Sequence, residues 1–452
     1  MLVMKFGGTS VGDAERVRTV VRLVGDRLDR RPVVVVSALA GVTNDLVDLA
    51  RRALKGPAAV NGLRDRHREV IDGLGLPGDL VQEEQEDLRS LLKGITLVGE
   101  LTPRSLDCIM SFGERMSARI VAAAFRASGH AATACDAYDL GLVTDERFGA
   151  ASPLESCYEG LGRALAAVEG IPVVTGFIGK DRRGNITTLG RGGSDYTASI
   201  LGRACAAEEI QIWTDVDGVM SADPKMCPAA RSLEVISFAE ASELAYYGAK
   251  VVHPSTMIPA VRARIPVRVL NTWRPDHPGT VILDRAPRAP GIVKSIASRS
   301  RLSLISVTST RMLMQPGFMA RLFEVFGRHE VVIDMVATSE VTVSLTTDTQ
   351  KDLGPALEEL RQFAGVEVEG RHAIVCVVGE GLRDSPGTVA AIFDALRDAG
   401  VRARMVTMAA SNVNVSVLVP ERSVAKAVKA LHARFFEDAP ARKPKRRRAG
   451  PR

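Results

Sequence analysis

A glycine-rich stretch at residues 188–198 has the residue types of an anion-binding loop. Between Gly190 and Asp195 it combines three glycines with an arginine, a serine and an aspartate, and helix-forming apolar residues follow from Ala198 onward. Glycines let backbone N–H groups approach an anion closely, and the first turn of a helix adds unpaired N–H groups and a partial positive charge. The stretch therefore predicts a bound anion, with a plain strand-to-helix turn as the alternative.

A second glycine-rich junction follows the first strand of the chain. Lys5 stands near the end of an apolar strand at residues 2–6. Gly7, Gly8 and Ser10 come next and lead into a helix with valines at helical spacing. Because the lysine precedes the glycines, this is not a Walker P-loop. Lys5 is a candidate phosphate ligand, although a charge at a strand end can also be purely structural.

Carboxylates supply two further candidates. Glu114 lies where residues 111–116 are predicted to open a helix, so it either binds a ligand or only favours the helix dipole. Three aspartates follow the predicted strand at 210–213, and they either hold Mg²⁺, directly or through water, or cap turns. These aspartates are Asp215, Asp217 and Asp223.

The elements that must position these residues follow one pattern. Strands repeatedly end in polar loops that open helices, and residues 33–36 are four valines, typical of a strand buried on both faces of a parallel sheet. This is the pattern of a doubly wound α/β domain, in which ligands bind at the carboxyl ends of the strands. Prolines and glycines across residues 272–291 mark a linker at its end.

Beyond the linker the sequence repeats itself. The Pro-Gly pair at residues 316–317 recurs at 386–387, and the pattern of residues 339–344 recurs at 411–416. Each copy predicts a small βαββαβ unit. Two such units without catalytic residues suggest a sensor, and a structural or oligomerising appendage is the alternative.

Composition excludes several classes of protein. The net charge of +6 depends on a basic C-terminal run, without which the chain is near neutral, so we expect a solvated, disordered tail and no nucleic-acid binding. The six cysteines are scattered without zinc-ligand or disulfide-framework spacing, which fits a reducing cytosol. No signal-like segment or membrane-length apolar run is present, so we expect a soluble intracellular protein.

Six motifs taken together resemble the aspartokinases of the amino-acid kinase superfamily. They occupy residues 5–10, 41–44, 112–114, 188–197, 213–215 and 238–254. The resemblance implies an α/β fold: an amino-acid kinase domain, an αβα sandwich with a mostly parallel central sheet, followed by two ACT-like βαββαβ domains. The expected boundaries are 1–285 for the catalytic domain, 296–370 and 371–437 for the two ACT domains, and 438–452 for the basic tail.

The resemblance implies transfer of the γ-phosphoryl group of ATP, with Mg²⁺, to the side-chain carboxylate of L-aspartate. The product, 4-phospho-L-aspartate, starts the route to lysine, threonine and methionine. A carboxylate with an ordinary pKa of about 3.9 is already ionised, so positioning and charge neutralisation replace a general base. By the family pattern, Lys5 and Asp195 serve catalysis. Lys5, Gly7, Gly8, Ser10, Thr214, Asp215, Asp223 and Lys250 bind ATP, and Thr43, Glu114, Arg191 and Ser194 bind aspartate. No protein ligand for the metal is implied.

The second half resembles lysine-sensitive aspartokinases in particular. The resemblance places bound L-lysine between ACT units of two subunits and implies a dimer, or a dimer of dimers, inhibited by its effector. The residues implied at the effector site are Met312, Gly317, Phe318, Asp334, Thr338, Ser339 and Glu340. Threonine remains an alternative effector, and no homoserine dehydrogenase domain is expected to follow.

Two rival functions stay open at this point. Another amino-acid kinase would phosphorylate a different acid, such as glutamate. A catalytically inactive amino-acid sensor would require the loss of phosphate or carboxylate ligands, yet Lys5, Arg191 and Asp195 are present. One departure from the family pattern is Met220, where many relatives carry a tyrosine near the adenine.

Overall fold

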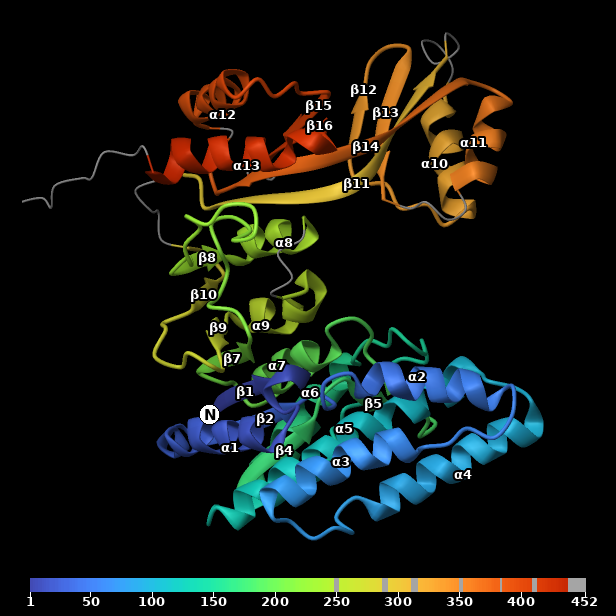
Figure 1. Cartoon of the computed structure of the whole chain (residues 1–452), viewed down its shortest axis with the longest axis vertical. Coiled ribbons are helices and arrows are strands. Elements are labelled where there is room, and N and C mark those ends of the chain that lie inside the picture. The colour runs from blue at the N-terminus through green and yellow to red at the C-terminus, as the bar shows by residue number, and fades with distance from the viewer. Residues whose placement is uncertain are drawn as a thin grey trace, which may run out of the picture. The chain divides into compact units, whose positions relative to one another are not determined.

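The computed structural model describes residues 1–247, 252–286, 292–309, 316–348, 353–382, 384–408 and 413–437. The chain forms two compact units, coloured blue to yellow-green and orange to red for the most part (Figure 1). The N-terminal unit comprises Met1–Val219, Ser232–Tyr246 and Lys250–Pro287, and the C-terminal unit comprises the remainder, including Met220–Arg231. The catalytic boundary expected from sequence, 1–285, takes no account of that internal excursion.

An eight-stranded sheet forms the centre of the N-terminal unit, in the order β3-β4-β2-β1-β7-β9-β10-β8. Neighbouring strands are parallel except for the antiparallel pair β9 and β10. The strands are β1 (Leu2–Phe6), β2 (Pro32–Val36), β3 (Ala132–Cys135), β4 (Ile171–Thr175), β7 (Glu209–Thr214), β8 (Val235–Ser237), β9 (Val267–Asn271) and β10 (Thr280–Leu283). The mostly parallel sheet predicted from sequence is confirmed.

Helices cover this sheet because its central strands are apolar on both faces. All five residues of β2 are buried, and Phe6 of β1 stacks on Trp213 of β7 with ring centroids 5.9 Å apart. The helices are α1 (Ala14–Gly25), α2 (Val42–Ala53), α3 (Asn61–Leu74), α4 (Gln82–Val98), α5 (Pro103–Ala127), α6 (Tyr158–Ala166), α7 (Gly193–Ala204), α8 (Phe238–Tyr246) and α9 (Ile258–Ala263). Helices α1, α2 and α4 contact α5, while α7 contacts α6, α9 and β1.

The topology places a crevice beside β1. Strand β1 pairs with β2 on one side and with β7 on the other, so the strand order reverses there. Such a switch point leaves room for a ligand beyond the carboxyl ends of the strands. A hairpin of β5 (Ile178–Lys180) and β6 (Ile186–Thr188) leads from β4 to the glycine-rich loop.

The C-terminal unit is built on one six-stranded antiparallel sheet, in the order β12-β13-β11-β14-β16-β15. Its strands are β11 (Ser295–Thr308), β12 (Val336–Thr338), β13 (Thr342–Thr347), β14 (Gly365–Val378), β15 (Met405–Met408) and β16 (Asn414–Pro420). Its helices are α10 (Phe318–Arg328), α11 (Leu353–Arg361), α12 (Pro386–Asp398) and α13 (Val424–His432), which a π-helical turn, Ala433–Glu437, extends.

Both predicted repeats share this sheet. The long strands β11 and β14 pair along their length, so Ser295 lies opposite Val378 and Thr308 lies opposite Gly365. The first half of β11 therefore supplies the edge that completes the second repeat, and the boundary expected at residues 370 and 371 falls inside β14.

No helix of the described residues is long and apolar enough to cross a membrane.

Candidate functional site

Helix α5 carries Glu114 into the crevice from its middle, not from its start. Thr102 caps the helix by accepting a hydrogen bond from the Ser105 N–H, and Pro103 occupies the first turn. The prediction that residues 111–116 open a helix is therefore wrong, because the start signal lies a full two turns earlier. Glu114 is thus too far from the helix N-terminus for the dipole to explain it.

The Glu114 carboxylate is buried and only half satisfied. Its side chain belongs to a residue that is 3% exposed, and the Ala38 N–H donates to its Oε1 at 3.1 Å. Its Oε2 has no hydrogen-bond partner among the described residues. Burial raises the pKa of Glu114 to about 8, against the opposing effect of the Lys5 ammonium. Such a carboxylate is prepared to receive a cation.

An ion pair joins the two glycine-rich junctions. Lys5 Nζ lies 2.6 Å from Asp195 Oδ1, and both side chains are largely shielded from water. Lys5 comes from β1, whereas Asp195 lies in the first turn of α7, where a negative charge is favourable. The aspartate therefore holds the ammonium at the point where the helix N-terminus offers its own N–H groups.

The glycines of the loop meet specific steric demands. Gly190 and Gly192 adopt positive φ angles of 74° and 70°. A Cβ on Gly193 would lie 2.4 Å from the Phe177 ring, and one on Gly8 would lie 2.7 Å from the Ala38 carbonyl oxygen. Side chains at these positions would displace the loops that surround Lys5.

These groups line a cavity of about 240 Å³. The lining residues are Lys5, Ser37, Thr43, Glu114, Phe177, Gly190, Gly192, Gly193, Ser194 and Asp195. The cavity thus contains an ammonium, a free carboxylate oxygen, hydroxyl groups and a helix N-terminus. It can receive a small zwitterion and an anion side by side.

Two lining residues, Ser37 and Phe177, were not singled out in the sequence. Ser37 directly follows β2, so its position at a strand end was the available signal. Phe177 adopts a positive φ of 69°, which is costly for an aromatic residue, and its N–H donates to Thr197 Oγ1 at 2.9 Å. The glycine before it is required, since a Cβ on Gly176 would lie 2.6 Å from the Ser194 side chain.

Asp107, two turns before Glu114 on α5, fixes the start of the glycine-rich loop. Its Oδ2 accepts from the Thr188 N–H at 2.8 Å and from the Gly149 N–H at 2.9 Å, and its Oδ1 accepts from the Thr188 hydroxyl at 2.9 Å. Burial raises the pKa of Asp107 despite these donors. One helix thus positions both the carboxylate and the loop of the cavity.

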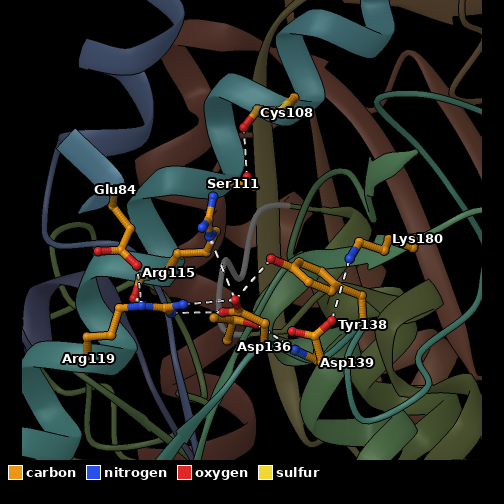
Figure 2. Close-up of polar contacts among 11 residues, drawn as sticks. Glu84, Cys108, Ser111, Arg115, Arg119, Asp136, Tyr138, Asp139 and Lys180 are labelled. Atoms are coloured by element: carbon orange, nitrogen blue, oxygen red, sulfur yellow. Dashed lines mark hydrogen bonds and ion pairs between the residues drawn. The ribbon is translucent and has the colours of Figure 1, made fainter. Parts of the chain in front are cut away.

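A second polar network anchors α5 to the end of β3 (Figure 2). Arg119 donates two hydrogen bonds of 3.0 Å to Asp136, and the Tyr138 hydroxyl donates to the same carboxylate at 2.9 Å. Arg119 also pairs with Glu84 of α4, and Arg115 Nε lies 3.7 Å from Asp136 Oδ2. The network therefore anchors α5 next to Glu114, whose carboxylate lines the cavity.

The other residues predicted to bind the nucleotide do not line this cavity and lie at several separate places. Ser10 is fully buried, and its hydroxyl bonds Thr272 at 2.8 Å. The Thr214 hydroxyl, at the carboxyl end of β7, donates to Asp215 at 3.1 Å. Asp223 belongs to the C-terminal unit and accepts from the Lys225 N–H at 2.9 Å, as a turn cap does. Lys250 lies outside the described residues.

On the aspartate side, Thr43 and Ser194 reach the cavity, while Arg191 lies between two of its lining glycines. Arg191 is exposed and makes no ion pair with the described residues. Gly7 continues from β1, and its N–H donates to the Trp213 carbonyl at 3.3 Å.

In the C-terminal unit, Asp334 is a predicted effector residue with an enclosed carboxylate. Its side chain is fully buried, and Arg299 Nη1 lies 2.8 Å from its Oδ1. Gly317, with a φ of 89°, caps α10, and Phe318 packs against Phe363.

The remaining effector candidates surround a turn. Ser339 accepts from the Thr342 N–H through its hydroxyl, and both Thr338 and Glu340 are exposed. Met312 lies outside the described residues.

Comparisons with known proteins agree with this architecture. Residues 1–271 match the amino acid kinase family, and residues 305–362 and 375–435 match the ACT domain. Aspartokinase 2 of Arabidopsis thaliana is 38% identical over 97% of this chain and 85% of its own length. Lysine-sensitive aspartokinase 3 of Escherichia coli is 35% identical over 97% of this chain and 99% of its own.

Solved structures extend the likeness to the whole fold. Escherichia coli aspartokinase III in complex with aspartate and ADP, described as its R-state, superposes with a TM-score of 0.80 at 34% identity. That likeness covers 96% of this chain and 100% of the other. The same enzyme with lysine and aspartate, described as its T-state, gives 0.81 at 35% identity over 96% and 99%.

Proposed function

This chain belongs to the aspartokinase family, and we propose that it transfers the γ-phosphoryl group of ATP to the side-chain carboxylate of L-aspartate. The observation that carries the proposal is the buried Glu114, whose Oε2 is free in the same cavity as Lys5 and Asp195. The Glu114 carboxylate can bind the ammonium group of an amino-acid acceptor. The Lys5 ammonium beside it can bind the phosphate of a phosphoryl donor.

The acceptor is held at both of its backbone groups. Glu114 receives the α-ammonium of aspartate, and Thr43 and Ser194 add hydrogen bonds. The exposed Arg191 turns onto the α-carboxylate, which its planar guanidinium binds with two parallel hydrogen bonds. The side-chain carboxylate of the substrate then points toward Lys5. Because this carboxylate is already ionised, no general base is needed.

Neutralisation of charge is the main catalytic contribution of the protein. Lys5 binds the transferring phosphoryl group, with N–H groups from the glycine-rich loops and the α7 N-terminus beside it. Asp195 keeps the ammonium in place at 2.6 Å before the nucleotide arrives. Because attacking and leaving groups are both anionic, this preorganised positive field lowers the barrier more than proton transfer would.

The donor set fits a magnesium ion that arrives with the nucleotide. The cavity offers one carboxylate beside Lys5, that of Asp195, which is far short of the six or so oxygens of an all-protein site. Phosphate oxygens and water would supply the rest of its ligands. When bound, Mg²⁺ would offset negative charge on the phosphates.

The rest of the nucleotide lies beyond the carboxyl end of β7. Thr214 ends this strand and Asp215 follows it directly, next to the β1 strand that carries Lys5. We assign Thr214 and Asp215, together with Lys250, to the nucleotide, and Ser10 to the support of the phosphate loop through Thr272.

The ACT domains bind an inhibitory amino acid, most simply L-lysine, at Asp334 and the turn that contains Ser339 and Glu340. The support is the buried carboxylate of Asp334 and the lysine complex known for the Escherichia coli relative. Since Arg299 already pairs with Asp334, the effector ammonium must share or replace that guanidinium.

Two subunits, or a dimer of dimers, would enclose the effector between their ACT domains. The proposed location is the cytosol, for which the cysteine pattern is the support. Size-exclusion chromatography with light scattering, with and without lysine, tests the assembly.

A substrate panel tests the proposed activity. ADP release should require L-aspartate, with L-glutamate and N-acetylglutamate inactive as acceptors. Release with glutamate and not with aspartate would assign the chain to another amino-acid kinase activity, and no release with any acid would favour an inactive sensor.

A further inference from the structure

A buried thiol and a buried imidazole lie beside a carboxylate at the C-terminal end of helix α13. The Cys227 sulfur, a ring nitrogen of His432 and a carboxylate oxygen of Glu437 all lie within 4.8 Å of one another. Cys227 is 3% exposed and His432 is 1% exposed, whereas the Glu437 side chain is about half exposed. All three belong to the C-terminal unit, whereas the cavity that contains Glu114 belongs to the N-terminal unit. We propose that Cys227, His432 and Glu437 form a zinc-binding site.

The backbone brings two of the ligands to one side. The π-helical turn Ala433–Glu437 directly continues α13, and a π-helix joins residues five positions apart. His432 and Glu437 have this spacing, and His432 Nδ1 lies 2.7 Å from Glu437 Oε1. An ordinary α-helical continuation would not align the same pair, so the rare turn has a specific consequence at this place.

The third ligand comes from a distant part of the sequence. Cys227 lies in the segment Met220–Arg231, where the chain leaves the N-terminal unit and packs within the C-terminal unit. Within that segment Cys227 N–H donates to the Asp223 carbonyl, and its own carbonyl accepts from the Ala230 N–H. Because the ligands are not close in sequence, the cysteine and histidine spacing used above gave no sign of a metal site.

The outer contacts of His432 suit a metal at Nδ1. Its Nε2 lies 3.0 Å from the Ser221 hydroxyl, which also accepts from the Arg231 N–H. The Phe436 ring stacks on the imidazole with centroids 4.7 Å apart. When Nε2–H donates to Ser221, the Nδ1 lone pair is available to a metal, and such a second contact is what orients a metal-bound histidine.

The ligand types and dimensions favour Zn²⁺. One sulfur, one nitrogen and one oxygen form a typical zinc donor set, and tetrahedral bonds of about 2.0–2.3 Å place the donor atoms about 3.3–3.7 Å apart. His432 Nδ1 and Glu437 Oε1 lie 2.7 Å apart and all three ligand atoms lie within 4.8 Å of one another, so side-chain shifts of about 1 Å reach that range. The exposed Glu437 leaves room for water as the fourth ligand. Binding releases the thiol proton to solvent.

Without a metal, the same side chains form only a hydrogen-bonded chain from Ser221 through His432 to Glu437. The experiment must therefore detect the thiolate. The full-length protein is purified under reducing conditions, stripped with a chelator and titrated with Zn²⁺ alone, or with Co²⁺ as a spectroscopic probe. Zinc content is measured by mass spectrometry after desalting.

We expect about one equivalent of zinc per chain, a thiolate-to-cobalt charge-transfer band and a higher unfolding temperature with Zn²⁺. Cys227→Ala should abolish the band and the zinc-dependent stabilisation. Glu437→Gln, at an exposed position that tolerates substitution, should weaken zinc binding at least tenfold. Cys205→Ala, at a half-buried cysteine of the N-terminal unit, is the matched control and should behave as the wild type does.

Two outcomes would overturn the site. One is the absence of both bound zinc and a cobalt band in the wild type. The other is a band of equal intensity in Cys227→Ala, which would place the metal on another thiol. If Cys227→Ala fails to fold, Glu437→Gln decides, because unchanged zinc affinity in that variant excludes the proposed ligand set. Kinase activity does not enter the test.

Discussion

The two candidate ligand sites of this chain hold their buried carboxylates in opposite states. In the N-terminal unit, Glu114 keeps one oxygen without a hydrogen-bond partner among the described residues. In the C-terminal unit, the buried Asp334 is already paired with Arg299 at 2.8 Å. No ion pair to Glu114 is found among the described residues, whereas Asp334 forms one with Arg299.

This difference matches two different tasks. A substrate site gains from a group that only the substrate satisfies, since the unsatisfied state stores free energy for binding. A regulatory site must change partners, because an effector shifts a conformational equilibrium only by its differential affinity for the two states. We infer that Arg299 represents the effector-free arrangement at Asp334.

The largest expected effect tests the catalytic side of the comparison. Lys5→Ala removes the ammonium from the phosphoryl position, and kcat should fall by about 10³-fold, the loss typical of an electrostatic contact at a transition state. Steady-state ADP release at saturating substrates measures it. Lys180→Ala, a lysine over the Tyr138 ring outside the cavity, is the control and should retain activity. Retained turnover in Lys5→Ala with an intact circular dichroism spectrum would contradict the role of Lys5.

Substitution of the unsatisfied carboxylate should mainly affect substrate binding. Glu114→Gln keeps the shape of the side chain but removes the charge that meets the α-ammonium, so KM for aspartate should rise roughly 10- to 100-fold. KM for ATP should change little. The surface variant Glu100→Gln should match the wild type, and an unchanged aspartate KM in Glu114→Gln would remove the assignment.

The raised pKa of Glu114 gives the same site a pH signature. Aspartate binding requires the ionised form, so aspartate affinity of the wild type should increase as pH rises toward about 8 and then level off. In the unliganded protein, the free energy of unfolding changes with pH in the opposite direction. The folded state binds this proton more tightly than the unfolded chain, so the free energy of unfolding falls between about pH 4.5 and 8. Both slopes should flatten in Glu114→Gln, as denaturant titrations and KM profiles can measure.

On the regulatory side, the prediction is loss of inhibition without loss of catalysis. Asp334→Asn should raise the lysine concentration for half inhibition about tenfold or more, within the usual range of allosteric coupling. Asp348→Asn removes the other carboxylate that Arg299 contacts, at an exposed position, and should shift it much less. Equal shifts in the two variants would mean that the arginine, and not Asp334, determines effector binding.

The sequence predicted well which residues stand at the strand ends, because local patterns encode their positions. The glycines, Lys5 and Asp195 stand at strand–loop–helix junctions, and the parallel sheet brings their ends together. Glu114 was recognised from a motif. The start of its helix was nevertheless predicted too late in the sequence, because the Thr102 cap lies outside the motif. Local signals find residues more readily than they find element boundaries.

What the sequence could not predict depends on tertiary contacts. The positive φ of Phe177 is visible only in the backbone, because its residue type does not predict this conformation. The sharing of β11 and β14 between two repeats likewise depends on long-range pairing. The same holds for the packing of Met220–Arg231 with the C-terminal unit, since nothing in that segment's composition differs from an ordinary loop.

The smallest expected effect separates positioning of the loop from anchoring of the helix. Asp107→Asn weakens the hold on Thr188, so KM for aspartate should rise a few-fold while kcat changes less. Asp136→Asn breaks the Arg119 pair at the other side of α5, so it should lower the unfolding temperature with a smaller change in KM. If both variants change KM equally, α5 acts on the cavity as one rigid body, and the free carboxylate of Glu114 depends on the whole helix rather than on the loop beside it.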